Sequence, residues 1–330
     1  MSHLTDGTHF TMRSLDKSRP TAAELSTLGD LNPWILSELK AYGHVRWPPG
    51  VILFDTPIYN IHYHGGRWVG CGRHYSRYGS SSEYDYRVIF EKDFTTRLVF
   101  TGPQEESAIL IRGCRGWICE NITLEHDNDG VVVDVYSDLG RPSNHFSFRS
   151  VSFMGGTGIR FGGIGDPNNA ADVCFHDVAF PYCTVKGFET NNIQNVNYWF
   201  YGLYVEQTPL GLHCIEGGNL AVYGCQTWTT VLLKVDRGGS NGGSYSLHDI
   251  KMDSNSSETQ KTLVDASDMT SDSRFHISQA NITKHSENNL AFPILIEPND
   301  PVARAGTSWH LTPDMYRGPF GASWVPTTLS

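Results

Sequence analysis

Phe148-Arg-Ser-Val-Ser-Phe153 and Phe175-His-Asp-Val-Ala-Phe180 share one pattern, in which an apolar residue and two mostly polar residues precede an apolar-any-apolar triplet. Copies of this pattern start at residues 118, 148, 175, 200, 247 and 277, and a weaker copy starts at residue 223. The starts from 148 onward lie 23 to 30 residues apart. Repetition at this period, with variable insertions, is typical of a solenoid in which each repeat stacks on its neighbours.

A second apolar segment follows each copy after a break rich in Gly or Asn. These segments cover residues 131–135, 159–161, 185–188, 212–215, 231–235, 263–266 and 294–296. Apolar and polar residues alternate along both segments, which is the period of a strand that buries one face. Stacked strands about 4.8 Å apart would form one continuous core. The sequence therefore predicts an all-β fold, a right-handed parallel β-helix.

Polar residues or glycine recur in the middle of the repeated pattern. They are Asn121, Ser150, Asp177, Gly202, Asp249 and Gln279. Asn, Asp and Gly accept left-handed or turn conformations, and polar side chains at one corner can hydrogen-bond along a stack. We therefore interpret these residues as a structural corner ladder rather than as catalytic groups.

The pattern divides the chain into four segments. We expect an N-terminal arm or attachment segment at 1–20, a capping helix at 21–42, the parallel β-helix at 43–300 and an irregular tail at 301–330. The spacing of Thr21 and Glu24 predicts a capping box at the start of the helix. A helix over the end of the stack would cover a sheet edge that otherwise invites aggregation.

The composition limits the class of protein. The chain has 330 residues, a formal net charge of -10 and seven cysteines. A negative chain without a basic cluster is a poor partner for nucleic acid. The odd cysteine count, without Cys-x-x-Cys pairs, predicts reduced thiols. The sequence lacks a signal-like start and a long apolar run, so we expect neither a signal peptide nor membrane insertion, the alternative being secretion with the signal already removed.

The opening coils carry a family resemblance. A helix ending at Gly43 precedes a Pro-Gly turn at 49–50, Trp-Val-Gly-Cys-Gly at 68–72 and Thr-Arg-Leu-Val-Phe at 96–100. These features resemble the start of the pectate-lyase-like right-handed β-helix superfamily, especially its phage tailspike and endopolysaccharidase branch. The resemblance extends as a pattern over roughly residues 24–300. It implies a β-helix that recognises a polysaccharide.

The resemblance does not select one activity. The superfamily includes polysaccharide lyases, glycoside hydrolases, epimerases and non-enzymatic receptor-binding spikes. This chain lacks the paired Asp residues and Gly-His-Gly turn of polygalacturonases, and also the Arg-Pro-Arg environment of calcium-dependent pectate lyases. These departures argue against pectin as the substrate.

One candidate site lies along the second strands of the repeats. Their alignment predicts an outward column of Asp134, Arg160, Lys186 and His213, with Glu189, Glu216 and Asp236 beside it. In this hypothesis Arg160 binds substrate, while Lys186, His213 and Glu216 are catalytic groups that neutralise a uronate and abstract its C5 proton. The alternative is a charge-paired surface that keeps the strands soluble.

A second candidate site follows the first strands. Glu206, Glu125 and Asp253 are its catalytic carboxylates, because a glycosidase needs two carboxylates that flank the sugar. The aromatic residues expected to bind the sugar are Tyr182, Tyr201, Tyr204 and Trp228. The alternative is that stacking alone brings carboxylates near each other on any β-helix.

Histidines are also frequent near the start of the chain. His62 and His64 form a His-x-His pair, with His44 and His74 nearby in sequence. Without a third ligand at fixed spacing, such a pair is typical of surface or packing residues, so we predict no metal and no cofactor.

Together these features predict a virion-associated, tailspike-like protein that recognises a bacterial surface polysaccharide, with depolymerisation by hydrolysis or elimination left open. We expect a homotrimer whose N-terminal arm contacts other virion proteins. One alternative is a free bacterial polysaccharide lyase or glycoside hydrolase, and another is a purely structural phage assembly protein.

Overall fold

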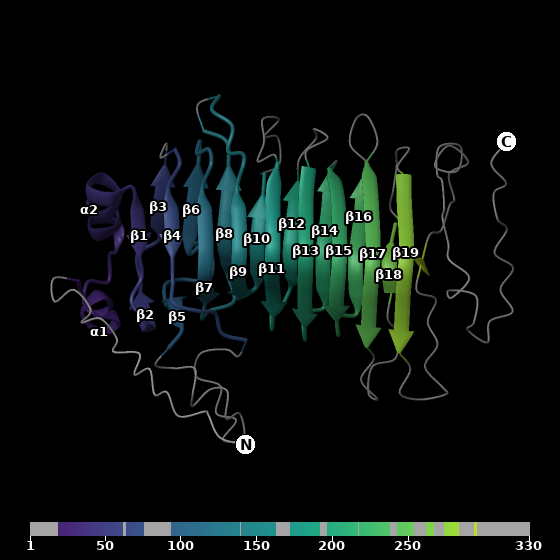
Figure 1. The fold of residues 1–330 in the computed structure, drawn as a ribbon, viewed down its shortest axis with the longest axis horizontal. Helices are drawn as coiled ribbons and strands as arrows, with labels where there is room; N and C mark the ends of the chain where they lie inside the picture. Colours follow the sequence, from purple (N-terminus) through teal and green to yellow (C-terminus); the bar gives the residue numbers. More distant parts are fainter. Residues whose placement is uncertain are drawn as a thin grey trace, which may run out of the picture.

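The fold is seen in a computed structural model of the chain. It describes residues 19–61, 64–75, 94–138, 140–162, 172–191, 197–216, 218–237, 243–253, 262–266, 274–283 and 294–295. Within them the chain is an all-β parallel solenoid of about seven turns, with two helices at its N-terminal end (Figure 1). The predicted fold class is confirmed. The predicted arm, apart from residues 19 and 20, and the predicted tail lie outside the described residues.

Two parallel sheets run along the solenoid. The first contains β1 (His44–Arg46), β4 (Arg67–Val69), β7 (Ile118–His126), β9 (Ser147–Met154), β11 (Val173–Pro181), β13 (Asn197–Glu206), β15 (Asn219–Thr227), β17 (Ser244–Asp253) and β19 (Arg274–Thr283), with β2 (Gly50–Phe54) and β5 (Thr96–Phe100) beside this path. The second contains β20 (Ile294–Leu295), β18 (Thr262–Asp265), β16 (Val231–Arg237), β14 (Leu210–Glu216), β12 (Lys186–Asn191), β10 (Thr157–Phe161), β8 (Val131–Tyr136), β6 (Ile109–Arg112) and β3 (Ile58–Ile61). Each predicted repeat thus supplies one strand to each sheet.

Apolar side chains stack in register inside the solenoid. The rings of Phe148 and Phe175 lie 5.2 Å apart and those of Phe175 and Phe200 lie 4.3 Å apart, both nearly parallel. The same inward column contains Cys119 and Val222, so the predicted repeat starts at residues 118 and 223 were each wrong by one position. The core therefore tolerates small residues where the six-residue pattern is weakest.

Six long strands of the first sheet, β7, β9, β11, β13, β15 and β17, each bend at a left-handed residue. Positive φ angles occur at Asn121 (55°), Ser150 (50°), Asp177 (52°), Gly202 (77°), Gly224 (76°) and Asp249 (55°). These are the predicted corner residues with Gly224 added; the side chain of Gln279 lies outside the described residues. Phe175 and Val178 both face the core, which leaves His176 and Asp177 as two consecutive outward residues at the bend.

The bend gives the first sheet two outer faces. The pre-corner face carries outward side chains that precede the bend, such as His176 and Tyr201. The post-corner face carries those that follow it, such as Tyr204 in β13; Ala179 has the same register position in β11 but is fully buried. Residues close in sequence on either side of a corner therefore face different directions.

Helices α1 (Ala22–Ser26) and α2 (Asn32–Tyr42) cover the N-terminal end of the stack (Figure 1). The predicted capping box is present, since the Thr21 hydroxyl accepts from the Glu24 N–H and the Glu24 carboxylate accepts from the Thr21 N–H. A left-handed Gly43, with φ of 71°, ends α2.

Side chains of the helical segment also hydrogen-bond to backbone N–H groups at the edge of the first coil. The Leu53 N–H donates to Ser26 Oγ at 3.0 Å, and the Tyr59 N–H donates to Asn32 Oδ1 at 2.7 Å. These bonds pair backbone groups that an open sheet edge would expose.

Replacing Asp249 with Val should lower the free energy of unfolding by about 1–2 kcal/mol, because a β-branched residue is strained in the left-handed conformation. Replacing Asp249 with Gly, the residue that positions 202 and 224 carry at the same corner, should change it by less than about 0.5 kcal/mol. Chemical denaturation measures both values. A Val variant as stable as the parent chain would contradict the left-handed corner.

Candidate functional site

A column of charged side chains follows the outer face of the second sheet. The strand register aligns Asp134, Arg160, Glu189, His213 and Lys234 on successive strands. This column replaces the predicted one in part, because Glu189 occupies the position expected for Lys186. The charged column and the charges that bond to it are called the charge ladder below.

The misplacement of Lys186 has a simple cause. The alignment of the repeats with one another predicts Val185 as a core residue of the strand, but Val185 is 51% exposed and precedes β12. Phe188 is the residue that stacks over Ile159 and under Leu212. Lys186 therefore lies three residues before the column position, paired with Thr157.

The side chains of the charge ladder nevertheless meet. Arg160 donates to both carboxylate oxygens of Asp134, at 2.9 and 2.6 Å. Lys186 Nζ lies 2.5 Å from Glu189 Oε2 and 3.0 Å from His213 Nδ1. The hydrogen bond to Asp134 raises the pKa of Arg160, so this guanidinium stays charged. The predicted contacts around Lys186 and His213 are present, although the register differs.

His213 is held in one tautomer by its two partners. An ammonium group can only donate, so Lys186 donates to Nδ1, and the Nε2 proton is donated to Asp236 Oδ2 at 2.8 Å. Burial lowers the pKa of His213, the Lys186 charge lowers it further, and the hydrogen bond to Asp236 opposes both. His213 is only 8% exposed. Because its pKa is lowered from the usual value of 6.5, the imidazole is neutral at pH 7.

Glu216 lies near the ladder but at the end of its strand. It is half-buried three residues after His213 and is in register with Asn191 and Arg237. The structure therefore places Glu216 beside this surface, at the end of β14.

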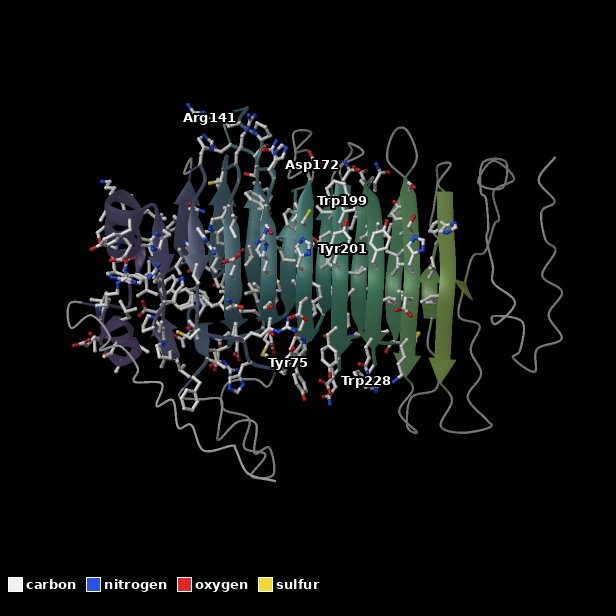
Figure 2. The ribbon with its side chains drawn as sticks, viewed as in Figure 1. Tyr75, Arg141, Asp172, Trp199, Tyr201 and Trp228 are labelled. Atoms are coloured by element: carbon white, nitrogen blue, oxygen red, sulfur yellow. The ribbon has the colours of Figure 1, made fainter. Side chains whose placement is uncertain are left out.

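A second cluster lies on the post-corner face near the ends of β13 and β15. The ring of Tyr204 makes edge contacts with Trp228 at 5.4 Å and with Tyr75 at 5.7 Å. The Tyr204 hydroxyl donates to Glu206 Oε2 at 2.8 Å. All four residues are half-buried. Tyr75, Tyr204 and Trp228, called the aromatic cluster below, thus meet at Tyr204, whose hydroxyl binds a carboxylate. Tyr75 and Trp228 lie at one edge of the ribbon in Figure 2.

Tyr75 was not among the predicted site residues. It comes from an excursion after β4 and reaches β13, more than 100 residues later in the chain, so no repeat spacing indicates the contact. The only sequence signal is the abundance of Tyr, Arg and Ser after residue 72.

Two of the three predicted carboxylates, Glu125 and Glu206, do not converge. Glu125 is 1% exposed and its carboxylate accepts from Arg97 Nε at 2.7 Å. Glu125 is in register with Met154 and Glu206 with Pro181, which puts Glu125 and Glu206 three coil steps, about 14 Å, apart. Asp253 ends β17, and its side chain lies outside the described residues.

The other two predicted aromatic residues, Tyr182 and Tyr201, differ in position. Tyr182 follows β11 with φ of 59°, and its N–H donates to the Glu206 carbonyl at 2.8 Å. Tyr201 lies on the pre-corner face, well away from Trp228 in Figure 2. Only Tyr204 and Trp228 of the four belong to the aromatic cluster.

Tyr201 belongs to a flat stack of rings on the pre-corner face. Its ring lies 5.0 Å from His176 and 5.3 Å from Tyr223, and Tyr223 lies 4.9 Å from His248, all within 13° of parallel. Tyr201 and Tyr223 are 42% and 43% exposed, but each ring is covered on both faces by its neighbours. This stack offers edges and hydroxyl groups to solvent rather than open ring faces.

The part of the chain that the structure describes contains no cluster of three or more His, Cys, Asp or Glu side chains placed to hold a metal ion. In the same part of the chain, no helix is long and apolar enough to span a membrane. Comparison of the chain with models of protein families, with curated proteins and with solved structures finds no match.

Replacing His213 with Gln should flatten the dependence of stability on pH. The folded pKa of His213 lies below the unfolded value of about 6.5, so the unfolded chain binds the proton more tightly, and stability falls as the pH drops through about 6.5. The free energy of unfolding, measured from about pH 7.5 to 5, should therefore decline less in the variant than in the parent chain.

His145→Asn is the matched control, because the His145 side chain is 66% exposed and Asn tolerates its φ of 59°. It should keep the parental slope. An unchanged slope in the His213 variant would contradict the burial of a neutral imidazole in the charge ladder.

Proposed function

We propose that this protein binds a polysaccharide on the post-corner face of its solenoid, over the aromatic cluster. The observation that carries the proposal is that Tyr204 contacts the rings of Tyr75 and Trp228 and also donates to the carboxylate of Glu206. The rings meet edge-on, with interplanar angles of 81° and 67°, so each pair covers one ring face with the edge of a ring rather than with a whole stacked ring.

This arrangement fits the chemistry of a sugar. Carbohydrate-binding sites combine aromatic surface, which packs against the apolar C–H face of a sugar ring, with a few polar groups that fix its orientation. Glu206 uses one oxygen to accept from Tyr204, and a carboxylate has further acceptor capacity for sugar hydroxyl groups. The long side of a solenoid also suits an extended polymer.

The geometry favours recognition over hydrolysis by the pair Glu125 and Glu206. A glycosidase places its two carboxyl groups about 5–9.5 Å apart, whereas Glu125 and Glu206 are about 14 Å apart along the stack. Glu125 is also buried against Arg97. The aromatic cluster therefore supports binding without requiring bond cleavage at this place.

The biological setting in this proposal is a bacteriophage particle. The resemblance to the tailspike branch of right-handed β-helix proteins supports a virion-associated spike that recognises a bacterial surface polysaccharide. The exposed Tyr201 and Tyr223 stack supports a homotrimer, because copies of the chain could cover it. Residues 1–20 would join the spike to other virion proteins.

A second candidate function is a polysaccharide lyase or glycoside hydrolase, either on the virion or as a free bacterial enzyme. The contacts of Lys186, His213 and Asp236 favour it, because they bring an ammonium group, a neutral imidazole and a carboxylate together. Release of unsaturated uronates or reducing ends would distinguish this function from binding alone. A purely structural assembly protein would show neither binding nor release.

Replacing Trp228 or Tyr204 with Ala should weaken polysaccharide binding about tenfold, because each removes an aromatic surface worth about 1.4 kcal/mol. Affinity electrophoresis through gels containing purified capsular polysaccharides and O-antigens measures the dissociation constants. Tyr223→Ala is the control, since this tyrosine is 43% exposed on the pre-corner face. Equal losses in Tyr223→Ala and Trp228→Ala, or a panel with no bound polysaccharide, would contradict the proposal.

A further inference from the structure

Residues 70–75, called the strap below, leave the first sheet at its corner. β4 and β5 both pair with β7, the first before Asn121 and the second after it. The chain between them is therefore an insertion into what would otherwise be one bent strand. It emerges beside the left-handed corner of the next coil, and its first residues cross the post-corner face.

Backbone contacts hold the beginning of the strap against β7. The Gly72 N–H donates to the Asn121 carbonyl at 3.0 Å, and the His74 N–H donates to Thr123 Oγ1 at 2.6 Å. A Cβ atom on Gly70 would lie 2.3 Å from the Asn121 carbonyl oxygen, so this close approach requires glycine. The strap therefore starts from a tightly defined position.

One ion pair holds the far end of the strap. Arg73 crosses to β11, where Nη2 lies 2.8 Å from Asp177 Oδ1 and Nη1 donates to the Asp177 carbonyl. Ser150 Oγ donates to the other carboxylate oxygen of Asp177 at 2.9 Å. The Arg73 side chain is only 8% exposed, so water covers little of the guanidinium and the contact with Asp177 matters more than it would for a surface arginine.

The same guanidinium contacts Tyr75. Its carbon lies 4.7 Å from the centre of the Tyr75 ring, and Nη2 donates to the Tyr75 hydroxyl. The Tyr75 ring then meets Tyr204 edge-on. A continuous chain of contacts thus leads from the corner residue Asp177 through Arg73 to the aromatic cluster.

We propose that Arg73 and Asp177 form a latch that positions Tyr75 against Tyr204 and so builds one wall of the polysaccharide site. The inference rests on the proposed function, and it makes Arg73 and Asp177 positioning residues that act through Tyr75. Asp177 then has a second role besides its left-handed corner conformation. A guanidinium suits this role because its plane bonds a carboxylate while its face packs on an aromatic ring.

The first test needs no ligand. Asp177→Asn keeps a residue that tolerates the left-handed conformation but removes the charge. Hydrogen exchange of the full-length protein, read on peptides that cover residues 70–75, should be faster in Asp177→Asn and Arg73→Ala. Asp249→Asn makes the same change at the equivalent corner of β17 and should leave this exchange unchanged. Unchanged exchange in both latch variants would overturn the latch.

The second test uses the polysaccharide that the parent chain binds most tightly. Arg73→Ala and Asp177→Asn should each weaken binding about tenfold, and Arg73→Lys should restore part of the loss, because it keeps the charge but not the planar contact. In a Tyr75→Ala background, Arg73→Ala should cause no further loss, since its effect passes through Tyr75. Fully additive losses would contradict a positioning role.

The two proposals fail in different ways. If Trp228→Ala weakens binding and the latch variants do not, the latch is wrong and the binding site stands. If Trp228→Ala has no effect or no polysaccharide binds, the proposed function is wrong. Arg73 and Asp177 then do not position a binding residue, even if their replacement speeds hydrogen exchange in the strap.

Discussion

The left-handed residue at the corner of each coil is the constraint on which the rest of this structure depends. An L-residue with a side chain pays about 1–2 kcal/mol to adopt this conformation, so Gly, Asp and Asn recur there. The bend turns one long strand into two faces over a shared core. It separates Tyr201 from Tyr204, only three residues apart, and it is the point at which the strap departs. The position of the aromatic cluster follows from that geometry.

The two outer surfaces of interest differ in how their polar groups are used. In the charge ladder, Asp134 pairs with Arg160, and Lys186 contacts both Glu189 and His213. These polar groups therefore bind one another within the protein. In the aromatic cluster the rings meet edge-on, and the Tyr204 hydroxyl donates to one carboxylate. The first arrangement mainly stabilises a half-buried surface, whereas the second presents apolar rings beside a hydrogen-bond acceptor. That difference places the proposed polysaccharide site on the post-corner face.

Much of the fold could be predicted from the sequence, because stacking repeats one local pattern. Phe148, Phe175 and Phe200 mark an inward column directly, and the strands of both sheets follow. The prediction was less exact where a repeat is weak, as at Val222, or where an exposed apolar residue imitates a core position, as at Val185. Register depends on which apolar side chains find space inside, and the sequence pattern alone does not contain that information.

The candidate site was less predictable for a different reason. Tyr204, Trp228 and Glu206 lie at strand ends whose stacking the repeat implies, and sequence reasoning selected all three. Tyr75 and its contact with Arg73 depend on an insertion that crosses several coils, and such a contact has no period. The corner also separates Tyr201 from Tyr204, because a left-handed residue between them breaks the alternation that a straight strand would have.

Hydroxyl-radical footprinting of the full-length protein, with and without a bound polysaccharide, tests the central claim most directly. Mass spectrometry reads the oxidation of each aromatic side chain, and Tyr201 and Tyr223 serve as internal references on the pre-corner face. The account predicts that the polysaccharide protects Tyr75, Tyr204 and Trp228 while the two reference tyrosines oxidise at their free rates. Protection of Tyr201 and Tyr223, with Tyr75, Tyr204 and Trp228 unchanged, would contradict it.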